Sequence, residues 1–215
     1  MTNLLRVLGE LGCQASFLPQ NRQYVERYTP ALQALGVEAL HAPYAQDPVR
    51  LLRERGREFD LVILSRHYVA AEYLGLVRLH APQARIAFDT VDLHYLRERR
   101  AAELSGDPAL RRHAEHTRAQ ELKLIRECDV TLVVSEVERE LLARDAPGAR
   151  VEILSNVHEV YGCRKPFGER RDLVFVGGFQ HPPNTDAVGW FVSEIFTRVR
   201  AAIDGVRFHV IGSKV

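Results

Sequence analysis

The chain has 215 residues, of which 46% are hydrophobic and 27% are charged, a composition typical of a globular protein. Its 29 Lys and Arg residues nearly balance its 28 Asp and Glu residues, which gives a formal charge of +1. This balance excludes the broad electrostatic attraction on which generic nucleic-acid binders depend, so we expect no nucleic-acid partner. The three cysteines, Cys13, Cys128 and Cys163, are odd in number and widely spaced, which disfavours a disulfide framework and a structural zinc site.

The chain has no stretch that approaches the roughly 18 apolar residues of a membrane span. Its N-terminal apolar segment contains Arg6 and Glu10, so it does not have the pattern of a secretory signal. We therefore expect no transmembrane segment, and a protein that resides in the cytoplasm or lies peripheral to the membrane.

Short apolar segments alternate with amphipathic segments along nearly the whole chain, which predicts βα units stacked around a parallel sheet. Most of these apolar segments lack alternation, as expected for strands that are covered on both faces. We expect one Rossmann-like parallel sheet from Gln14 to Leu154 and a smaller βαβ segment from Leu173 to Ile211. The predicted strands are Gln14–Leu18, Val37–His41, Leu61–Ser65, Arg85–Asp89, Thr131–Ser135, Val151–Leu154, Leu173–Val176 and Val206–Ile211.

The predicted helices between these strands begin with a capping residue followed by proline, at Thr29-Pro30, Asp47-Pro48 and Asp107-Pro108. The longest helix is predicted over Pro108 to Glu127, where apolar residues recur at helical spacing. His113 and His116 lie three apart on it, but no third ligand is close in the sequence, so we interpret both as surface residues and expect no metal site.

The alternation is interrupted between Asn156 and Arg171, where glycines and prolines predict a linker. We predict a Rossmann-like domain over residues 1–156, a linker over 157–171, and the first βαβ unit of a second Rossmann-like domain over 172–215. The helix predicted over Thr2 to Leu11 has no strand before it, although a doubly wound domain normally opens on a central strand. We expect that strand to be missing, and the chain to self-associate through the exposed backbone.

Polar residues gather where helices follow the carboxyl ends of strands, the edge at which open α/β sheets bind ligands. The segment Asp89 to Arg99 brings together two carboxylates, an imidazole and guanidinium groups, which could bind hydroxyls, move a proton or hold a phosphate. A capped helix start with a surface cluster that neutralises itself explains the same residues. Both interpretations stay open on the residues alone.

Three other loops follow strands in the same way. Val176 to Asn184 carries paired glycines before a predicted helix over Thr185 to Ile203, so its backbone could approach a diphosphate, or the glycines could simply form a turn. Ser65 to Tyr68 could contact a sugar or a phosphate, but it has no G-x-S-x-G nucleophile motif. Ser135 and Glu138 fit a capping box at a helix start.

Several of these segments occur in a familiar order: D-T-V-D-L-H-Y-L-R-E-R-R, V-T-L-V-V-S-E-x-E, V-E-I-L-S-N, L-V-F-V-G-G-F-Q-H-P-P-N-T-D-A-V-x-W-F and F-H-V-I-G-S. In this order they resemble the family 4 glycosyltransferases of the two-domain GT-B fold, over nearly the whole chain. The resemblance implies retaining transfer of a sugar from a nucleotide-diphosphate sugar to a glycan or lipid-linked acceptor, in glycan or polysaccharide assembly. It also implies an acceptor-side N-terminal domain, a donor-side C-terminal domain, no cofactor and no obligatory metal.

The resemblance implies two catalytic residues near the reacting sugar, Asp92 and His94. The residues expected to bind substrate lie in the loops after two neighbouring predicted strands and are Arg66, His67, Asp89 and Arg97. The residues expected to bind the donor diphosphate lie in the glycine-rich loop and are Gly177, Gly178 and Asn184.

The chain departs from the family at the donor site, because no two of its glutamates have the family's Glu-x7-Glu spacing. We therefore expect an internal piece of a glycosyltransferase, truncated at both ends and inactive alone. One alternative is a catalytically incomplete fragment that acts as a binding or interaction domain. Another is a nucleotide-sugar epimerase of the same fold, because fold does not determine function.

Overall fold

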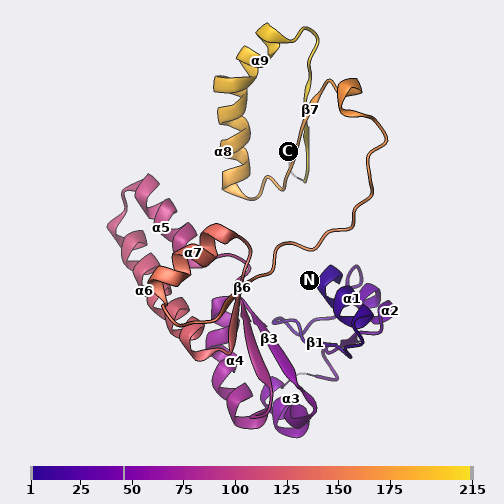
Figure 1. The fold of residues 1–215 in the computed structure, drawn as a ribbon, viewed down its shortest axis with the longest axis vertical. Helices are drawn as coiled ribbons and strands as arrows, with labels where there is room; N and C mark the ends of the chain where they lie inside the picture. Colours follow the sequence, from indigo (N-terminus) through magenta and orange to yellow (C-terminus); the bar gives the residue numbers. More distant parts are fainter. Residues whose placement is uncertain (1, 46, 214–215) are drawn as a thin grey trace. The chain divides into compact units, whose positions relative to one another are not determined.

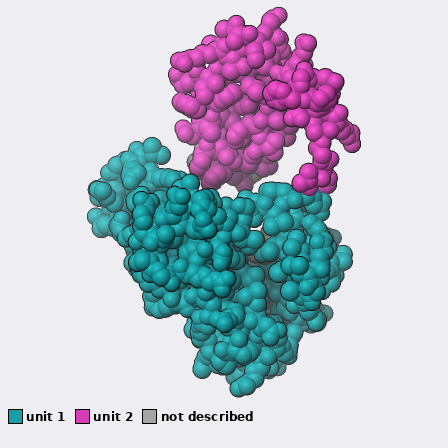
Figure 2. All heavy atoms as spheres, viewed as in Figure 1, with its two compact units in different colours: residues 1–159 teal, residues 160–215 magenta. Residues whose placement is uncertain are grey.

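The computed structural model describes residues 2–45 and 47–213, so the outer ends of the predicted domains, at residues 1 and 215, lie outside the described residues. The chain divides into two compact units, residues 1–159 and 160–215 (Figure 2). Helices and parallel strands alternate in both units, which confirms the predicted α/β class. The division falls inside residues 157–171, whose role as a linker stays a prediction.

The larger sheet of the first unit has four parallel strands in the order β3-β4-β5-β6 (Figure 1). Each parallel pair requires a crossover, and helices provide these connections. The register pairs Ser65 with Asp89, so β3 and β4 end level at the carboxyl edge of the sheet. The strands are β3 (Leu61–Ser65), β4 (Arg85–Asp89), β5 (Val130–Val133) and β6 (Val151–Ile153).

The core of this unit forms where helices cover the sheet. Helix α4 packs on β3 and β4, α7 packs on β5 and β6, and α6 packs against both α4 and α5. Ile86, Ala87 and Phe88 are consecutive residues of β4 and all are buried, as expected for a strand covered on both faces. Ile125 of α6 and Leu142 of α7 are buried in the same core. The helices are α3 (Pro48–Arg55), α4 (His67–His80), α5 (His94–Ser105), α6 (Pro108–Glu127) and α7 (Glu136–Asp145), with a 3-10 helix at Gly56–Glu58.

The helix starts test the capping predictions directly. Asp107 accepts a hydrogen bond from the Ala109 amide, and α6 begins and ends where the sequence predicts. Ser135 accepts from the Glu138 amide, which confirms the predicted cap of α7, but the Glu138 carboxylate accepts from the Val134 amide. The cap predicted at Thr29 is wrong, because Thr29 lies inside the first turn of its helix and its hydroxyl accepts from the Val25 amide.

The prediction of one sheet from Gln14 to Leu154 is wrong for the first two strands. They are two residues long and, in the described part of the chain, form a separate parallel pair with its own small core of Leu5, Leu32 and Val37. The Glu38 carboxylate holds this pair, because it accepts hydrogen bonds from Ser16 and from Arg55 of α3. The elements are α1 (Thr2–Glu10), β1 (Ser16–Phe17), α2 (Thr29–Ala34) and β2 (Glu38–Ala39).

The second unit is a single βαβ arrangement in which β7 (Leu173–Val176) pairs in parallel with β8 (Phe208–Ile211). A helical segment joins them and comprises α8 (Pro182–Trp190), a π-helical stretch (Phe191–Phe196) and α9 (Thr197–Ala202). It begins three residues before the predicted start. That this unit opens a second Rossmann-like domain stays a prediction.

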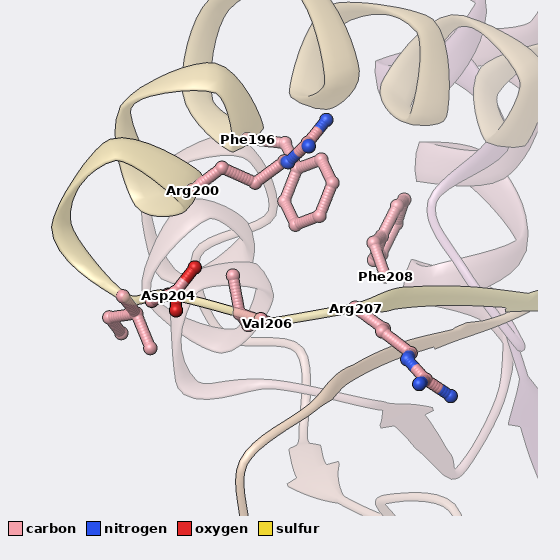
Figure 3. A pocket seen from close by; sticks show the side chains of 8 residues that line it. Phe196, Arg200, Asp204, Val206, Arg207 and Phe208 are labelled. Atoms are coloured by element: carbon pink, nitrogen blue, oxygen red, sulfur yellow. The ribbon is translucent and has the colours of Figure 1, made fainter.

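Aromatic side chains fill the contact between helix and strands in the second unit. The ring centroids of Phe191 and Phe208 lie 4.7 Å apart, and those of Phe196 and Phe208 lie 5.6 Å apart. Phe196 and Phe208 also line an open hollow of about 430 Å³ beside Arg200 and Arg207 (Figure 3). This hollow lies at the amino end of β8, on the opposite side from the carboxyl edge at which α/β sheets bind ligands.

Candidate functional site

The candidate site lies at the carboxyl edge of β3 and β4, where the last residues of the two strands contact each other. Ser65 donates a hydrogen bond of 2.8 Å to Asp89 Oδ2, and Asp89 Oδ1 accepts from the Val91 amide at 3.1 Å. The expected substrate-binding residue Asp89 therefore joins the strand ends and supports the loop that follows. Its place at this edge is the one that the sequence predicts.

The backbone at this edge is strained at two positions. Arg66, after β3, has φ of 79° and Val91, after β4, has φ of 65°. Side chains disfavour this left-handed region, and a β-branched residue disfavours it most. Such conformations gather at functional sites, where the surrounding structure holds them. The Arg66 amide donates to the Asp89 carbonyl oxygen, and its side chain is exposed.

Glu121 of α6 occupies the position of an N-cap for α5. Leu93 precedes α5, and its apolar side chain cannot accept a hydrogen bond from the helix. Glu121 instead accepts hydrogen bonds from the His94 amide at 3.2 Å and from the Tyr95 amide at 2.8 Å. The Glu121 side chain is 0% exposed, and its charge faces the positive end of the α5 dipole. A buried carboxylate is stable there because its oxygens are hydrogen-bonded.

The His94 side chain is 5% exposed and lies between two carboxylates. Its Nδ1 atom is 3.1 Å from the Asp92 carbonyl oxygen, 3.5 Å from Asp92 Oδ1 and 3.6 Å from Glu121 Oε1. Interaction with the Glu121 carboxylate is the main cause that raises the pKa of His94 above its usual value; the Asp92 charge adds to it, and burial opposes it. The expected catalytic residue is thus an imidazole with a defined orientation.

His67, the first residue of α4, packs its ring against that of His94 with centroids 4.7 Å apart. Its Nδ1 atom lies 4.0 Å from Glu121 Oε1, is buried, and has no hydrogen-bond partner among the residues that the structure describes. Burial lowers the pKa of His67, and the Glu121 charge opposes that shift in part. The structure therefore brings His67 and His94 together, although they are 27 residues apart in the sequence.

Asp92 and Arg97 form an ion pair on the exposed side of the site, with Arg97 Nη1 2.5 Å from Asp92 Oδ2. The expected catalytic residue Asp92 and the expected substrate-binding residue Arg97 thus neutralise each other, as the surface-cluster interpretation predicts. Because an exposed pair contributes only about 0 to 1 kcal/mol, a phosphate could replace Asp92 as the partner of Arg97 at little cost.

Sequence reasoning missed Glu121, and the helical pattern contained a signal for it. Glu121 lies seven residues after Ala114 and four before Ile125, so it falls on the apolar stripe of α6. A carboxylate on a buried helix face requires a polar partner. The two histidines considered as a metal pair are both exposed, and His113 lies 3.7 Å from Glu98.

In the glycine-rich loop of the second unit, the surroundings of Gly177 differ from those expected of a residue that binds a diphosphate. The Gly177 amide donates to the Ile211 carbonyl oxygen at 3.0 Å, so it is not open to a diphosphate. The Asn184 side chain donates to the Gly178 carbonyl oxygen at 3.0 Å and closes the loop. A Cβ atom added to Gly177 would lie 2.8 Å from Asn184 Nδ2 and 2.8 Å from the Phe175 ring, so these side chains would have to move.

No family model matches the chain, and a search of curated proteins finds no match. The chemistry of the carboxyl edge and the order of the motifs are therefore the features that point to a function.

Proposed function

We propose that the chain takes part in retaining transfer of a sugar from a nucleotide-diphosphate sugar to a glycan or lipid-linked acceptor. The observation that carries the proposal is the buried His94 imidazole, oriented by Glu121 beside Asp92 at the carboxyl edge of a parallel sheet. Ligands of open α/β sheets bind at this edge. A histidine is the side chain best suited to exchange a proton with a hydroxyl near neutral pH.

The proposal assigns separate roles to the residues of the edge. Glycosyl transfer breaks the bond between the anomeric carbon and the diphosphate oxygen, and joins that carbon to an acceptor oxygen, which loses its proton. Since His94 Nδ1 faces Asp92 and Glu121, we assign contact with a substrate oxygen to His94 Nε2. Asp92 and Asp89 would accept hydrogen bonds from sugar hydroxyls, and Arg66 and Arg97 would contact phosphate.

In the second unit, the proposal assigns contact with the donor diphosphate to the glycine-rich loop, at Gly178. Helix α8 begins with Pro182 and Pro183, which have no backbone N–H, and the Asn184 amide donates to the His181 carbonyl oxygen, so the contact falls to the loop before the helix. Asn184 holds the loop shape.

The proposal is tested by a sugar-transfer assay on two proteins. One is this chain, and the other is the product of the longest reading frame that contains it. We expect His94→Ala to lower turnover about 100-fold or more, because proton handling and positioning are both lost. The control His116→Ala changes an exposed histidine of α6 and should leave turnover unchanged. Absence of transfer from UDP, GDP and ADP sugars by both forms would contradict the proposal.

A second candidate function, a binding or interaction fragment, is favoured by the outer face of the β7-β8 sheet. Val174 is 62% exposed and Val176 is 73% exposed, and Ile211 lies on the same pair of strands. Apolar strand faces of this kind are typical of interaction surfaces. Titration with the same sugar nucleotides separates the two functions, since only the transferase binds them.

A further inference from the structure

Three side chains that bind metals well meet beneath the carboxyl edge of the first unit. His67 begins α4, His94 begins α5, and Glu121 lies in the middle of α6. One ligand atom from each, a ring nitrogen or a carboxylate oxygen, lies within 4.8 Å of the other two. The three side chains are 14%, 5% and 0% exposed, so the cluster is shielded from bulk water.

One atom of this cluster lacks a partner. In the described part of the chain, His67 Nδ1 is buried without a hydrogen bond, and Glu121 Oε1 is 4.0 Å away. That distance is too long for a hydrogen bond. A buried polar atom without a partner destabilises the fold, and such atoms point to a group that pairs with them.

A cation bound between the three side chains would pair with this atom. Bonds of about 2.0 to 2.1 Å place the ligand atoms of a tetrahedral zinc site about 3.3 Å apart. Glu121 Oε1 lies 3.6 Å from His94 Nδ1 and 4.0 Å from His67 Nδ1, so contraction by less than 1 Å brings these two pairs to that spacing. The ligand atoms of the two histidines lie within 4.8 Å of each other, so this third pair would contract by at most about 1.5 Å. The amides of His94 and Tyr95 orient the carboxylate, as outer partners orient metal ligands.

We propose that His67, His94 and Glu121 form a binding site for one divalent transition-metal ion of the Zn²⁺ class. Two imidazoles and one carboxylate are a ligand set of zinc sites that keep one position for water. This metal site is a proposal separate from sugar transfer, because it is inferred from the geometry of the three ligands alone. Metal binding is measured directly, so its failure would leave the transferase proposal unaffected.

The test titrates Zn²⁺ into the full chain in competition with a chromogenic chelator, after all metal has been removed. The protein carries no histidine tag. Exposed Cys13 and Cys163 are replaced by serine so that their thiols cannot bind zinc. We expect one ion per chain, and Co²⁺ bound at the same site should give the absorption bands of tetrahedral coordination.

The His67→Ala variant removes one ligand but leaves both amide bonds of Glu121 intact. We expect it to weaken Zn²⁺ affinity at least about 10-fold, the smallest loss typical even of outer partners. His116→Ala, on the exposed face of α6, should bind as tightly as the parent. If His67→Ala does not fold by circular dichroism, His67→Gln is measured in its place. Failure of the parent to bind zinc, or equal affinity in the folded His67 variant, would overturn the proposal.

Discussion

Single residues at this site have structural and chemical roles at once. Glu121 caps α5 through two amides and lies 3.6 Å from the His94 ring. Removing it would leave those amides without their acceptor and the imidazole with Asp92 as its one neighbouring carboxylate among the described residues, so its loss would disturb the fold as well as the chemistry. His67 and His116 give cleaner tests, because neither hydrogen-bonds to the backbone of α5.

A close backbone approach at Gly212 gives a prediction for the second unit. A Cβ atom there would lie 1.7 Å from the Gly177 carbonyl oxygen, so Gly212→Ala must push β8 away from the glycine-rich loop. We expect this variant to lose about 1 to 3 kcal/mol of unfolding free energy. Urea unfolding followed by the fluorescence of Trp190, the single tryptophan of the chain, measures it.

Gly189→Ala is the matched control, because a Cβ atom there has no neighbour within 4 Å. It lies within α8, where alanine favours the helix by about 0.5 to 1 kcal/mol, so this variant should be slightly more stable. Equal stability of the two variants would contradict the close approach.

At the scale of elements, the sequence predicted the features that depend on neighbouring residues and did not predict those that depend on tertiary contacts. The bounds of α6 follow from Asp107-Pro108 and the apolar spacing, because a cap and a helix face are local properties. The start of α5 could not be predicted that way, since its cap comes from Glu121 on another helix. The separation of β1 and β2 from the larger sheet also depends on pairing, which strand propensity does not specify.

The candidate site was predicted in part for the same reason. Asp89, Asp92 and His94 follow one strand, and the rule that ligands bind at carboxyl edges indicates that segment. The contact between His67 and His94 required the β3-β4 pairing, and the role of Glu121 required the packing of α6 on α5. The amide bond of Gly177 to Ile211 depends on strand pairing in the second unit, and no motif reveals it.

Asp129, just before β5, links elements and makes stability depend on pH. Its carboxylate accepts a 2.7 Å bond from the Ile86 amide of β4 and lies 3.1 Å from Arg78 of α4. The Ile86 amide is the main cause that lowers the pKa of Asp129, and Arg78 adds to it. Because the pKa of Asp129 is lower in the folded state than its ordinary value of 3.8, the Asp129 carboxylate stabilises the fold at pH values above 3.8. This stabilisation is lost as the pH falls through the pKa of the folded state.

We therefore expect Asp129→Asn to cost about 1 to 2 kcal/mol of unfolding free energy at pH 7. The difference from the parent should shrink as the pH falls below about 4, because the parent carboxylate then becomes protonated. Urea unfolding across this pH range measures it. Arg85→Gln is the control, since its side chain is 80% exposed and 3.8 Å from Asp129, and it should change stability little. A difference that stays constant with pH would contradict the assignment.

At the scale of the whole molecule, the described residues form three parallel sheets, and two of them have only two strands. An open sheet has two edge strands with unpaired backbone groups, so in a two-stranded sheet both strands are edge strands.

No helix among residues 2–45 and 47–213 is long and apolar enough to span a membrane.

These edges and the apolar outer face of β7 predict that the chain self-associates in solution. Val174 and Val176 are exposed on one strand, which gives a second chain both an apolar surface and a strand edge to pair with. Size-exclusion chromatography with light scattering over a range of concentrations should show a mass that rises above the 24.4 kDa of one chain.

Val174→Lys places a charge on that face and should shift the population toward monomer, because a buried lysine would oppose association. Glu103→Gln raises the net charge by the same single unit at an exposed position of α5, so it controls for net charge and should leave association unchanged. If the parent elutes as a monomer at every concentration, or if both variants change association equally, the face of β7 does not mediate contact between chains.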